Sequence, residues 1–314
     1  MESVNKWFTV SSEIPGTSAG TFPFITLFAD IRYMKGRLGM IVCPMLEDEA
    51  IYNIENDPEI DDVYLVTTPF TETIIPKLRQ HNVEYKRISP TEALAGKFDP
   101  EKYSVIIWVM FMGLHEDIDM LNLEVTNQIV TMFRSVDSIM LYYGRCGRGL
   151  DNICKWADAN IPIPVMIFRN RDGTMCDDCI CVPIGGTDRY LQLLRTYPGR
   201  LYFTPAMASN FEGFLSSMEL FNGLDTGNTE IMRIILDMAG YTDVMEVQTG
   251  LGDQENFHAN IDAFTKKYGL KWTVIEDGWA DKSLTDMNYD NAKKTMTRWL
   301  EQGIREPILG EAHD

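Results

Sequence analysis

An apolar run leads directly into a glycine-rich turn in the segment Ser138-Ile139-Met140-Leu141-Tyr142-Tyr143-Gly144-Arg145-Cys146-Gly147-Arg148-Gly149-Leu150. The run predicts a buried β-strand over residues 138–143, and a helix is expected to begin near Leu150. A buried strand that passes through a tight turn into a helix is typical of parallel α/β sheets. Cys146 is therefore expected at the carboxyl end of a strand, which is where open α/β sheets bind their ligands.

The same alternation of apolar strands and amphipathic helices continues on both sides of this segment. Further strands are predicted at residues 38–43, 63–67, 104–109, 163–168, 200–204, 244–248 and 271–275. Further helices are predicted at residues 46–54, 72–81, 117–134, 188–197, 229–239, 256–268 and 289–302. The predicted fold class is therefore α/β, with two or three lobes of parallel sheet flanked by helices.

The predicted elements divide the chain into an extension and three lobes. Residues 1–37 form the N-terminal extension, and the first α/β lobe spans residues 38–135. The second lobe, residues 136–224, carries the cysteine motifs, and the third, residues 225–314, includes the C-terminal helix. A pseudo-threefold arrangement of the lobes around a central site is one alternative.

Cys43, Cys146 and Cys179 each lie at or after the carboxyl end of a predicted strand. Because the carboxyl ends of parallel strands meet at one edge of a sheet, we predict that these thiols share one ligand shell. Cys176 and Cys181, in the same run as Cys179, are alternative ligands. Free cysteine is also a common core residue, so packing is the alternative interpretation for each thiol.

Arg145 and Arg148 flank one of these thiols where a helix is expected to begin. Guanidinium groups and the free N–H groups of a helix N-terminus both favour anions and thiolates. The glycines of the turn allow the backbone to approach a ligand closely, and they are Gly144, Gly147 and Gly149. These five residues are predicted to bind a small anionic ligand, with ordinary surface charge as the alternative.

Composition narrows the classes of partner. The 314 residues carry a formal net charge of -18, which is expected to serve solubility, and Glu47–Asp62 alone holds eight carboxylates. Nucleic acids and anionic membrane surfaces need clustered Lys and Arg, so neither is an expected partner. We find no apolar run of the ~20 residues that a spanning helix needs and no secretory signal, so we expect a cytoplasmic protein with free thiols.

Three converging thiols suit two kinds of metal centre. A 4Fe–4S cluster held by three cysteines keeps one iron open, and we favour it by analogy with cluster-dependent dehydratases and synthases. A zinc ion with three protein ligands also keeps one coordination position open. A cysteine nucleophile fits less well, because none of the four histidines forms a cysteine–histidine pattern. His115, after the strand 104–109, either faces the same crevice or marks the start of a helix.

The order of these motifs resembles that of an uncharacterised domain-of-unknown-function family from anaerobes, over about Leu38 to Leu300. The resemblance implies that the three strand-end cysteines are the family's cysteines. It also implies a setting beside corrinoid-dependent methylamine methyltransferase systems, in methyl-group metabolism such as methanogenesis. The chain departs from the pattern at Arg145 and Arg148, where uncharged residues are expected, and beside Asp178, where a histidine is expected. The segments that carry the resemblance are Cys43, Tyr143-Gly144-Arg145-Cys146-Gly147-Arg148-Gly149, Asp178-Cys179-Ile180 and Gly199-Arg200-Leu201-Tyr202-Phe203-Thr204-Pro205.

Two functions from different classes fit these observations. The first is an enzyme with a three-cysteine metal centre, of lyase or methyl-transfer type, that acts on a small anionic or methylated metabolite in anaerobic one-carbon metabolism. The second is a non-catalytic accessory protein that binds a corrinoid protein or a methyltransferase. A homo-oligomer is compatible with both.

Overall fold

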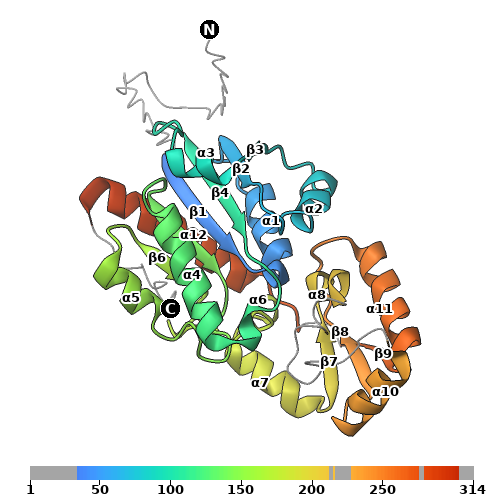
Figure 1. Ribbon diagram of the computed structural model, residues 1–314. Coiled ribbons are helices and arrows are strands. Elements are labelled where there is room, and N and C mark those ends of the chain that lie inside the picture. Colours follow the sequence, from blue (N-terminus) through green and yellow to red (C-terminus); the bar gives the residue numbers. More distant parts are fainter. Residues whose placement is uncertain (1–33, 212–214, 216–227, 276–278, 304–314) are drawn as a thin grey trace, which may run out of the picture. The chain divides into compact units, whose positions relative to one another are not determined.

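The computed structural model describes residues 34–211, 215, 228–275 and 279–303. Its larger sheet has six parallel strands in the order β3-β2-β4-β1-β5-β6 (Figure 1). The central strands β4, β1 and β5 are almost wholly buried, as their continuous apolar sequences require. The strands are β1 (Gly36–Val42), β2 (Asp62–Val66), β3 (Lys86–Ile88), β4 (Tyr103–Val109), β5 (Ser138–Tyr142) and β6 (Val165–Ile167).

Helices cover both faces of this sheet. Side chains of β1 alternate between two cores, with Met40 and Val42 on one face and Ile41 on the other. The core on the Met40 face includes α1 (Glu47–Glu55), α2 (Ile74–Gln80) and α12 (Ser283–Gln302). The core on the Ile41 face includes α3 (Pro90–Ala95), α4 (Ile118–Met132) and α5 (Ile153–Asn160).

A smaller sheet has three parallel strands, β7 (Arg200–Phe203), β8 (Asp243–Glu246) and β9 (Lys271–Val274). One of its faces packs against α10 (Thr229–Met238) and α11 (Gln254–Tyr268). The other packs against α6 (Cys181–Ile184) and α7 (Thr187–Thr196). Three short helices follow strands β1, β4 and β7, and they are η1 (Pro44–Leu46), η2 (Leu114–Glu116) and α8 (Pro205–Ser209).

The predicted α/β class with parallel sheets flanked by helices is confirmed. The strands on both sides of residue 135, however, belong to one sheet, because β5 pairs with β1 from Ser138 to Tyr142. The described residues therefore form two sheets, and α12 packs on the larger one rather than on the third predicted lobe. An apolar strand such as β5 needs a neighbour on each side, but its sequence does not say which strand that is.

Parts of the predicted organisation lie outside the described residues. Most of the N-terminal extension falls in residues 1–33, and the lobe boundary at residues 224 and 225 falls in 216–227. Among the helices that the structure does describe, none combines the length and apolar character needed to cross a membrane.

Candidate functional site

The crevice predicted from the sequence lies at the carboxyl ends of β1 and β5, which are neighbours in the larger sheet. The chain leaves β1 toward α1 on one face and leaves β5 toward α5 on the other. Neighbouring strands whose connections leave toward opposite faces open a ligand crevice. Cys43 follows β1 and Cys146 follows the end of β5, so both thiols lie at this point of the sheet.

Cys179 reaches the same crevice through backbone pairing. The N–H of Arg145 donates to the carbonyl of Cys176 at 2.8 Å, and the N–H of Cys146 donates to the carbonyl of Asp177 at 2.9 Å. The segment after β6 therefore runs alongside the end of β5. Gly144 permits this approach, since a Cβ there would lie 2.6 Å from the backbone carbonyl carbon of Asp178.

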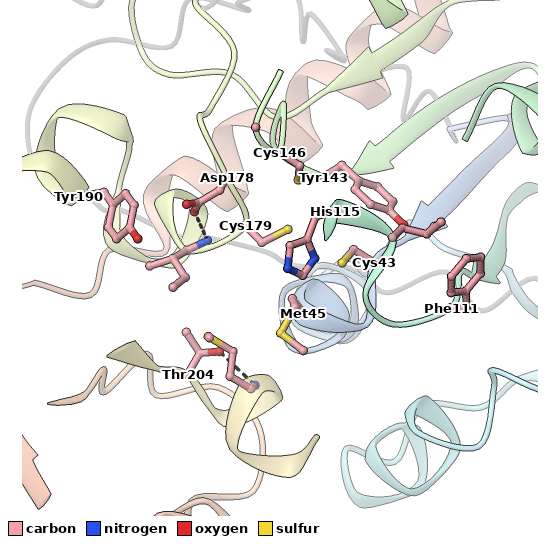
Figure 2. Close-up of a pocket in the computed structure, with 14 residues that line it drawn as sticks. Cys43, Met45, Phe111, His115, Tyr143, Cys146, Asp178, Cys179, Tyr190 and Thr204 are labelled. Carbon is pink, nitrogen blue, oxygen red and sulfur yellow. Dashed lines mark hydrogen bonds between the residues drawn. The ribbon is translucent and has the colours of Figure 1, made fainter. Parts of the chain in front are cut away.

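The sulfur of Cys179 is the centre of a hydrogen-bonded group of thiols. The thiols of Cys146 and Cys43 both donate to it, as does the N–H of Gly144, and these bonds hold the pKa of Cys179 well below its usual value. The same bonds, together with burial, raise the pKa values of Cys43 and Cys146 well above theirs. Figure 2 shows the three side chains gathered on one side of a pocket. The neighbouring thiols therefore favour negative charge on the Cys179 sulfur.

The turn that carries Cys146 has an uncommon backbone. Cys146, Gly147 and Arg148 all lie in the left-handed region, with φ values of 45°, 59° and 80°. For a residue with a Cβ this conformation costs about 1–2 kcal/mol. Bonds from Gly149 N–H to the Cys146 carbonyl and from Leu150 N–H to the Arg145 carbonyl, both 3.1 Å, hold the turn. Such strained residues cluster at functional sites, where the surrounding structure holds them in place.

A pocket of about 340 Å³ opens beside the three thiols. Its described lining is mainly apolar and aromatic, and it contains no Lys or Arg. Polar groups come from His115 and Asp178, with Thr204 at the start of α8. The apolar and aromatic lining residues are Met45, Phe111, Leu114, Tyr143, Ile180, Tyr190 and Met207. A space of this size and character suits a small ligand with an apolar part.

Besides the thiols and tyrosines, Asp178 and His115 also face this pocket (Figure 2). Burial and the neighbouring Cys179 raise the pKa of Asp178 to about 6. Its Oδ1 accepts the N–H groups of Ile180 at 2.8 Å and Cys181 at 3.3 Å, so the carboxyl group is fixed in place. The His115 imidazole contacts Glu116 through Nε2 at 3.0 Å. His115 lines the pocket and also lies in the short helix η2, so both interpretations of this residue from the sequence apply.

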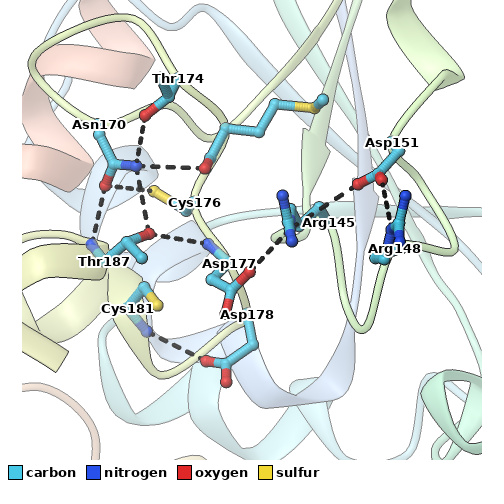
Figure 3. A network of polar contacts seen from close by, with 11 residues as sticks. Arg145, Arg148, Asp151, Asn170, Thr174, Cys176, Asp177, Asp178, Cys181 and Thr187 are labelled. Carbon is cyan, nitrogen blue, oxygen red and sulfur yellow. Dashed lines mark hydrogen bonds and ion pairs between the residues drawn. The ribbon is translucent and has the colours of Figure 1, made fainter. Parts of the chain in front are cut away.

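Arg145 and Arg148 lie elsewhere, in ion pairs (Figure 3). Arg145 Nε lies 2.7 Å from Asp177 Oδ1, and Arg148 Nε lies 3.2 Å from Asp151 Oδ2. Neither arginine lines the pocket, and the Arg148 side chain is 77% exposed. Of the glycines beside them, Gly147 alone lines the pocket. Both guanidinium groups are thus paired with carboxylates of this chain instead of facing a ligand in the crevice.

The alternative ligands Cys176 and Cys181 also lie outside the pocket lining. Both are fully buried, and burial raises the pKa of each. The Cys176 thiol donates to Asn170 Oδ1 at 3.6 Å, and Cys181 hydrogen-bonds the side chain of Thr187. The sixth cysteine, Cys154 on α5, is half-buried and packs against the core on the Ile41 face of the larger sheet.

A buried acidic group at the start of α1 was not foreseen. Glu47, Asp48 and Glu49 are 0%, 4% and 2% exposed, although the acidic charge of the chain is expected to serve solubility. Lys77 Nζ lies 2.9 Å from Asp48 Oδ1 and 3.3 Å from Glu47 Oε2. Burial and the charge of Asp48 raise the pKa of Glu49 to about 8. The group therefore holds a proton on Glu49 at neutral pH.

The thiols do not form a ready-made metal shell. In the described ranges, no group of three or more His, Cys, Asp or Glu side chains is already placed to hold a metal ion. A metal bound by the three cysteines would displace the protons of their thiols, because the thiolate is the form that binds metals.

Comparison with known proteins gives a family for the chain. The family model described as a protein of unknown function, DUF1638, matches residues 109–281, which is more than half of the chain. The matched region contains Cys146 and Cys179 but not Cys43. No curated protein and no solved structure matches the chain. The chain therefore belongs to the DUF1638 family of proteins of unknown function.

Proposed function

We propose that the chain binds a metal centre through Cys43, Cys146 and Cys179 and uses it on a small metabolite held in the adjoining pocket. The observation that carries this proposal is the contact of the Cys179 sulfur with both other thiols at the pocket wall. Three separate parts of the chain supply these thiols, and two of them follow neighbouring strands. Plain packing gives no reason for three thiols to come together at a pocket wall.

The spacing of the thiols favours one kind of centre. Thiolates around a single tetrahedral zinc ion, each ~2.3 Å from the metal, lie about 3.8 Å from one another. Cys179 contacts both other thiols, and around a zinc ion each sulfur likewise lies beside the other two. A cubane cluster binds each thiolate to a different iron and holds them further apart. We therefore favour a single zinc ion over a 4Fe–4S cluster.

The chain's own groups fit this role. Cys43 and Cys146 carry the protons that metal binding would release, so binding should tighten as the pH rises. Asp178 and His115 face the pocket and can hold or accept a proton beside a bound ligand. When bound, a zinc ion with one open position would supply a Lewis acid for a ligand atom such as a thiol sulfur.

The pocket lining favours a particular class of ligand. The described lining has no cationic side chain, and Arg145 and Arg148 are paired elsewhere. Burying an anion without a counter-charge is costly, so a methylated or otherwise apolar metabolite fits better than an anion. A methylated metabolite also agrees with the one-carbon metabolism of anaerobes that the sequence resemblance implies.

Elemental analysis of protein purified without oxygen and loaded with zinc tests the proposal. We expect about one zinc per chain in the wild type and loss of zinc in Cys146→Ser, since three thiolates are needed. Cys154→Ser is the matched control, and it should keep its zinc because Cys154 lies outside the pocket lining. Absence of metal from the wild type, or full retention in Cys146→Ser, would contradict the proposal.

A second candidate function is an accessory role. Beside the Cys146 turn, α4 exposes Ile118, Met120 and Leu123, with exposed fractions of 48%, 42% and 52%. A Cβ at Gly147 would lie 3.9 Å from Ile118 Cγ2, so this apolar surface adjoins the turn. Such a surface suits a protein partner, for example a corrinoid protein or a methyltransferase. A metal-free chain that binds a purified corrinoid protein, and loses that binding in Leu123→Glu, would favour this role.

A further inference from the structure

We infer that Asn170 and Thr187 are positioning residues that hold Cys179 against Cys146 and Cys43. This inference rests on the proposed metal site, but it also makes a prediction for the metal-free protein. Neither Asn170 nor Thr187 lines the pocket, so any effect on the thiols must pass through the backbone.

Asn170 uses both ends of its side-chain amide (Figure 3). Its Oδ1 accepts the N–H of Thr187 at 2.9 Å and the thiol of Cys176 at 3.6 Å. Its Nδ2 donates to Thr174 Oγ1 at 3.0 Å, to the Met175 carbonyl at 3.2 Å and to Thr187 Oγ1 at 3.2 Å. One side chain therefore ties the turn after β6 to the start of α7, and the cysteine-bearing segment runs between these two points.

Thr187 connects the Asn170 network to the cysteine-bearing turns by hydrogen bonds. Its Oγ1 accepts the N–H of Asp177 at 3.0 Å, and the carbonyl of Asp177 accepts the N–H of Cys146 at 2.9 Å. Asp177 is two residues from Cys179. The hydroxyl group thus holds Asp177, whose backbone links the two cysteine-bearing turns, as outer hydrogen bonds hold metal ligands in other proteins.

Gly186 permits the close approach of Asn170 to the start of α7. Gly186 has φ 124°, and a Cβ there would lie 2.9 Å from Asn170 Oδ1. Glycine at this position therefore allows the Asn170 amide to lie close to the start of α7. Because several hydrogen bonds meet at this amide, a substitution that removes one of them should displace the cysteine-bearing segment.

The test compares Thr187→Val, which keeps the shape but loses the hydroxyl, with Thr187→Ser, which keeps the hydroxyl. Cobalt(II) is the probe, because thiolate ligands give it a charge-transfer band whose intensity follows the number of bound thiolates. In Thr187→Val we expect the band per bound cobalt to fall to about two thirds, from three thiolates to two, and affinity to fall about 10–100-fold. Thr187→Ser should match the wild type. A purely structural role would lower the yield of folded protein without changing the spectrum per cobalt.

A second variant keeps the inference testable if Thr187→Val does not fold. Asn170→Asp keeps Oδ1 but places a carboxylate oxygen 3.2 Å from the Met175 carbonyl, where Nδ2 now donates. It should give the same loss of band intensity. Asn160→Asp is the control for the change of charge, since Asn160 donates only to Trp156 at the end of α5 among the bonds of its side chain that the structure shows. Full band intensity and affinity in both test variants would overturn the inference.

Wild-type protein that binds no cobalt would refute the proposed function but not the positioning role. The readout is then the yield of the Cys146–Cys179 disulfide after mild oxidation of the metal-free protein with diamide, measured by mass spectrometry. The yield should fall in Thr187→Val and stay unchanged in Thr187→Ser, because a displaced Cys179 no longer lies against Cys146. An unchanged yield in folded Thr187→Val would overturn the positioning role itself.

Discussion

The run after β6 carries three cysteines within six residues, and its two sides differ in chemistry. Cys179 faces the pocket, accepts hydrogen bonds from two thiols and has a pKa well below its usual value. Cys176 and Cys181 lie away from the pocket lining, and burial raises the pKa of each. The difference indicates that hydrogen-bond donors around a thiol, and not the residue type or the local sequence, set the direction in which its pKa shifts.

The largest effect on zinc affinity is expected when the cysteine that faces the pocket is replaced, compared with a cysteine on the other side of the run. Cys179→Ser removes the sulfur shared by the other two thiols and should weaken zinc binding by more than about a hundredfold. Cys181→Ser is the matched control on the other side of the run, and its zinc affinity should stay within about threefold of the wild type. Competition with a chelator measures both affinities. Equal losses of zinc affinity in the two variants would show that the two sides of the run do not differ in metal binding.

A second prediction concerns the contact that brings the run to β5. Gly144→Ala would place a Cβ 2.6 Å from backbone atoms of Asp178, which cannot move without moving Cys179. We expect a loss of about 2–3 kcal/mol of unfolding free energy, together with loss of zinc binding. Gly39→Ala is the control, because its Cβ would meet the flexible end of Met132 at 3.0 Å. Denaturant titration should show a smaller loss in Gly39→Ala.

The third prediction concerns the buried carboxylates of α1. The pKa of Glu49 is about 8 in the folded chain, above the ordinary value of 4.5. A raised pKa means that the folded state binds this proton more tightly, so the contribution to stability is complete below about pH 4.5 and is lost as the pH rises toward about 8. Glu49→Gln should therefore be more stable than the wild type at pH 8, by about 2–4 kcal/mol, and should show no such gain at pH 4.

Glu55→Gln is the control for Glu49→Gln, since Glu55 lies on the same helix with a side chain that is 42% exposed. Its unfolding free energy should change by less than about 1 kcal/mol at either pH. The same gain at pH 4 and pH 8 in Glu49→Gln would show that the proton on Glu49 is not the cause.

The smallest effect is expected at Arg148, which lies outside the pocket lining. Arg148→Ala removes an exposed ion pair with Asp151 and should change stability by at most about 1 kcal/mol, with zinc affinity unchanged. Arg145→Ala should lower the unfolding free energy by more than Arg148→Ala does, because Arg145 pairs with Asp177, two residues before Cys179. A large loss of ligand binding in Arg148→Ala would instead support the anion site that the sequence predicts at Arg145 and Arg148.

The fold class followed from patterns that act locally. Apolar runs such as 104–109 and 138–143 became central strands of a parallel sheet, and the thiols after strands β1 and β5 became neighbours because those strands pair. The pairing itself was not predictable, since a strand buried on both faces carries no mark of its partner. The lobes were therefore divided at residue 135, within what is one sheet.

The site was harder to predict where long-range partners decide it. Arg145 pairs with Asp177, which lies 32 positions later, so its charge is neutralised by a residue that the local sequence does not reveal. Glu47 and Asp48 are buried beside Lys77 of another helix, although carboxylates are almost never fully buried without a partner. His115 lines the pocket because η2 lies at its wall. A lone histidine after a predicted strand does not reveal where the helix that carries it will lie.

The central claim is that Cys43, Cys146 and Cys179 bind one metal ion. X-ray absorption at the zinc edge, on protein purified without oxygen and loaded with zinc, measures the ligands directly. The predicted spectrum has three sulfur atoms at ~2.3 Å and one lighter ligand at ~2.0–2.2 Å. One sulfur fewer is expected in Cys43→Ser. Zinc bound without sulfur, or a wild-type chain that retains no zinc at all, would contradict the claim.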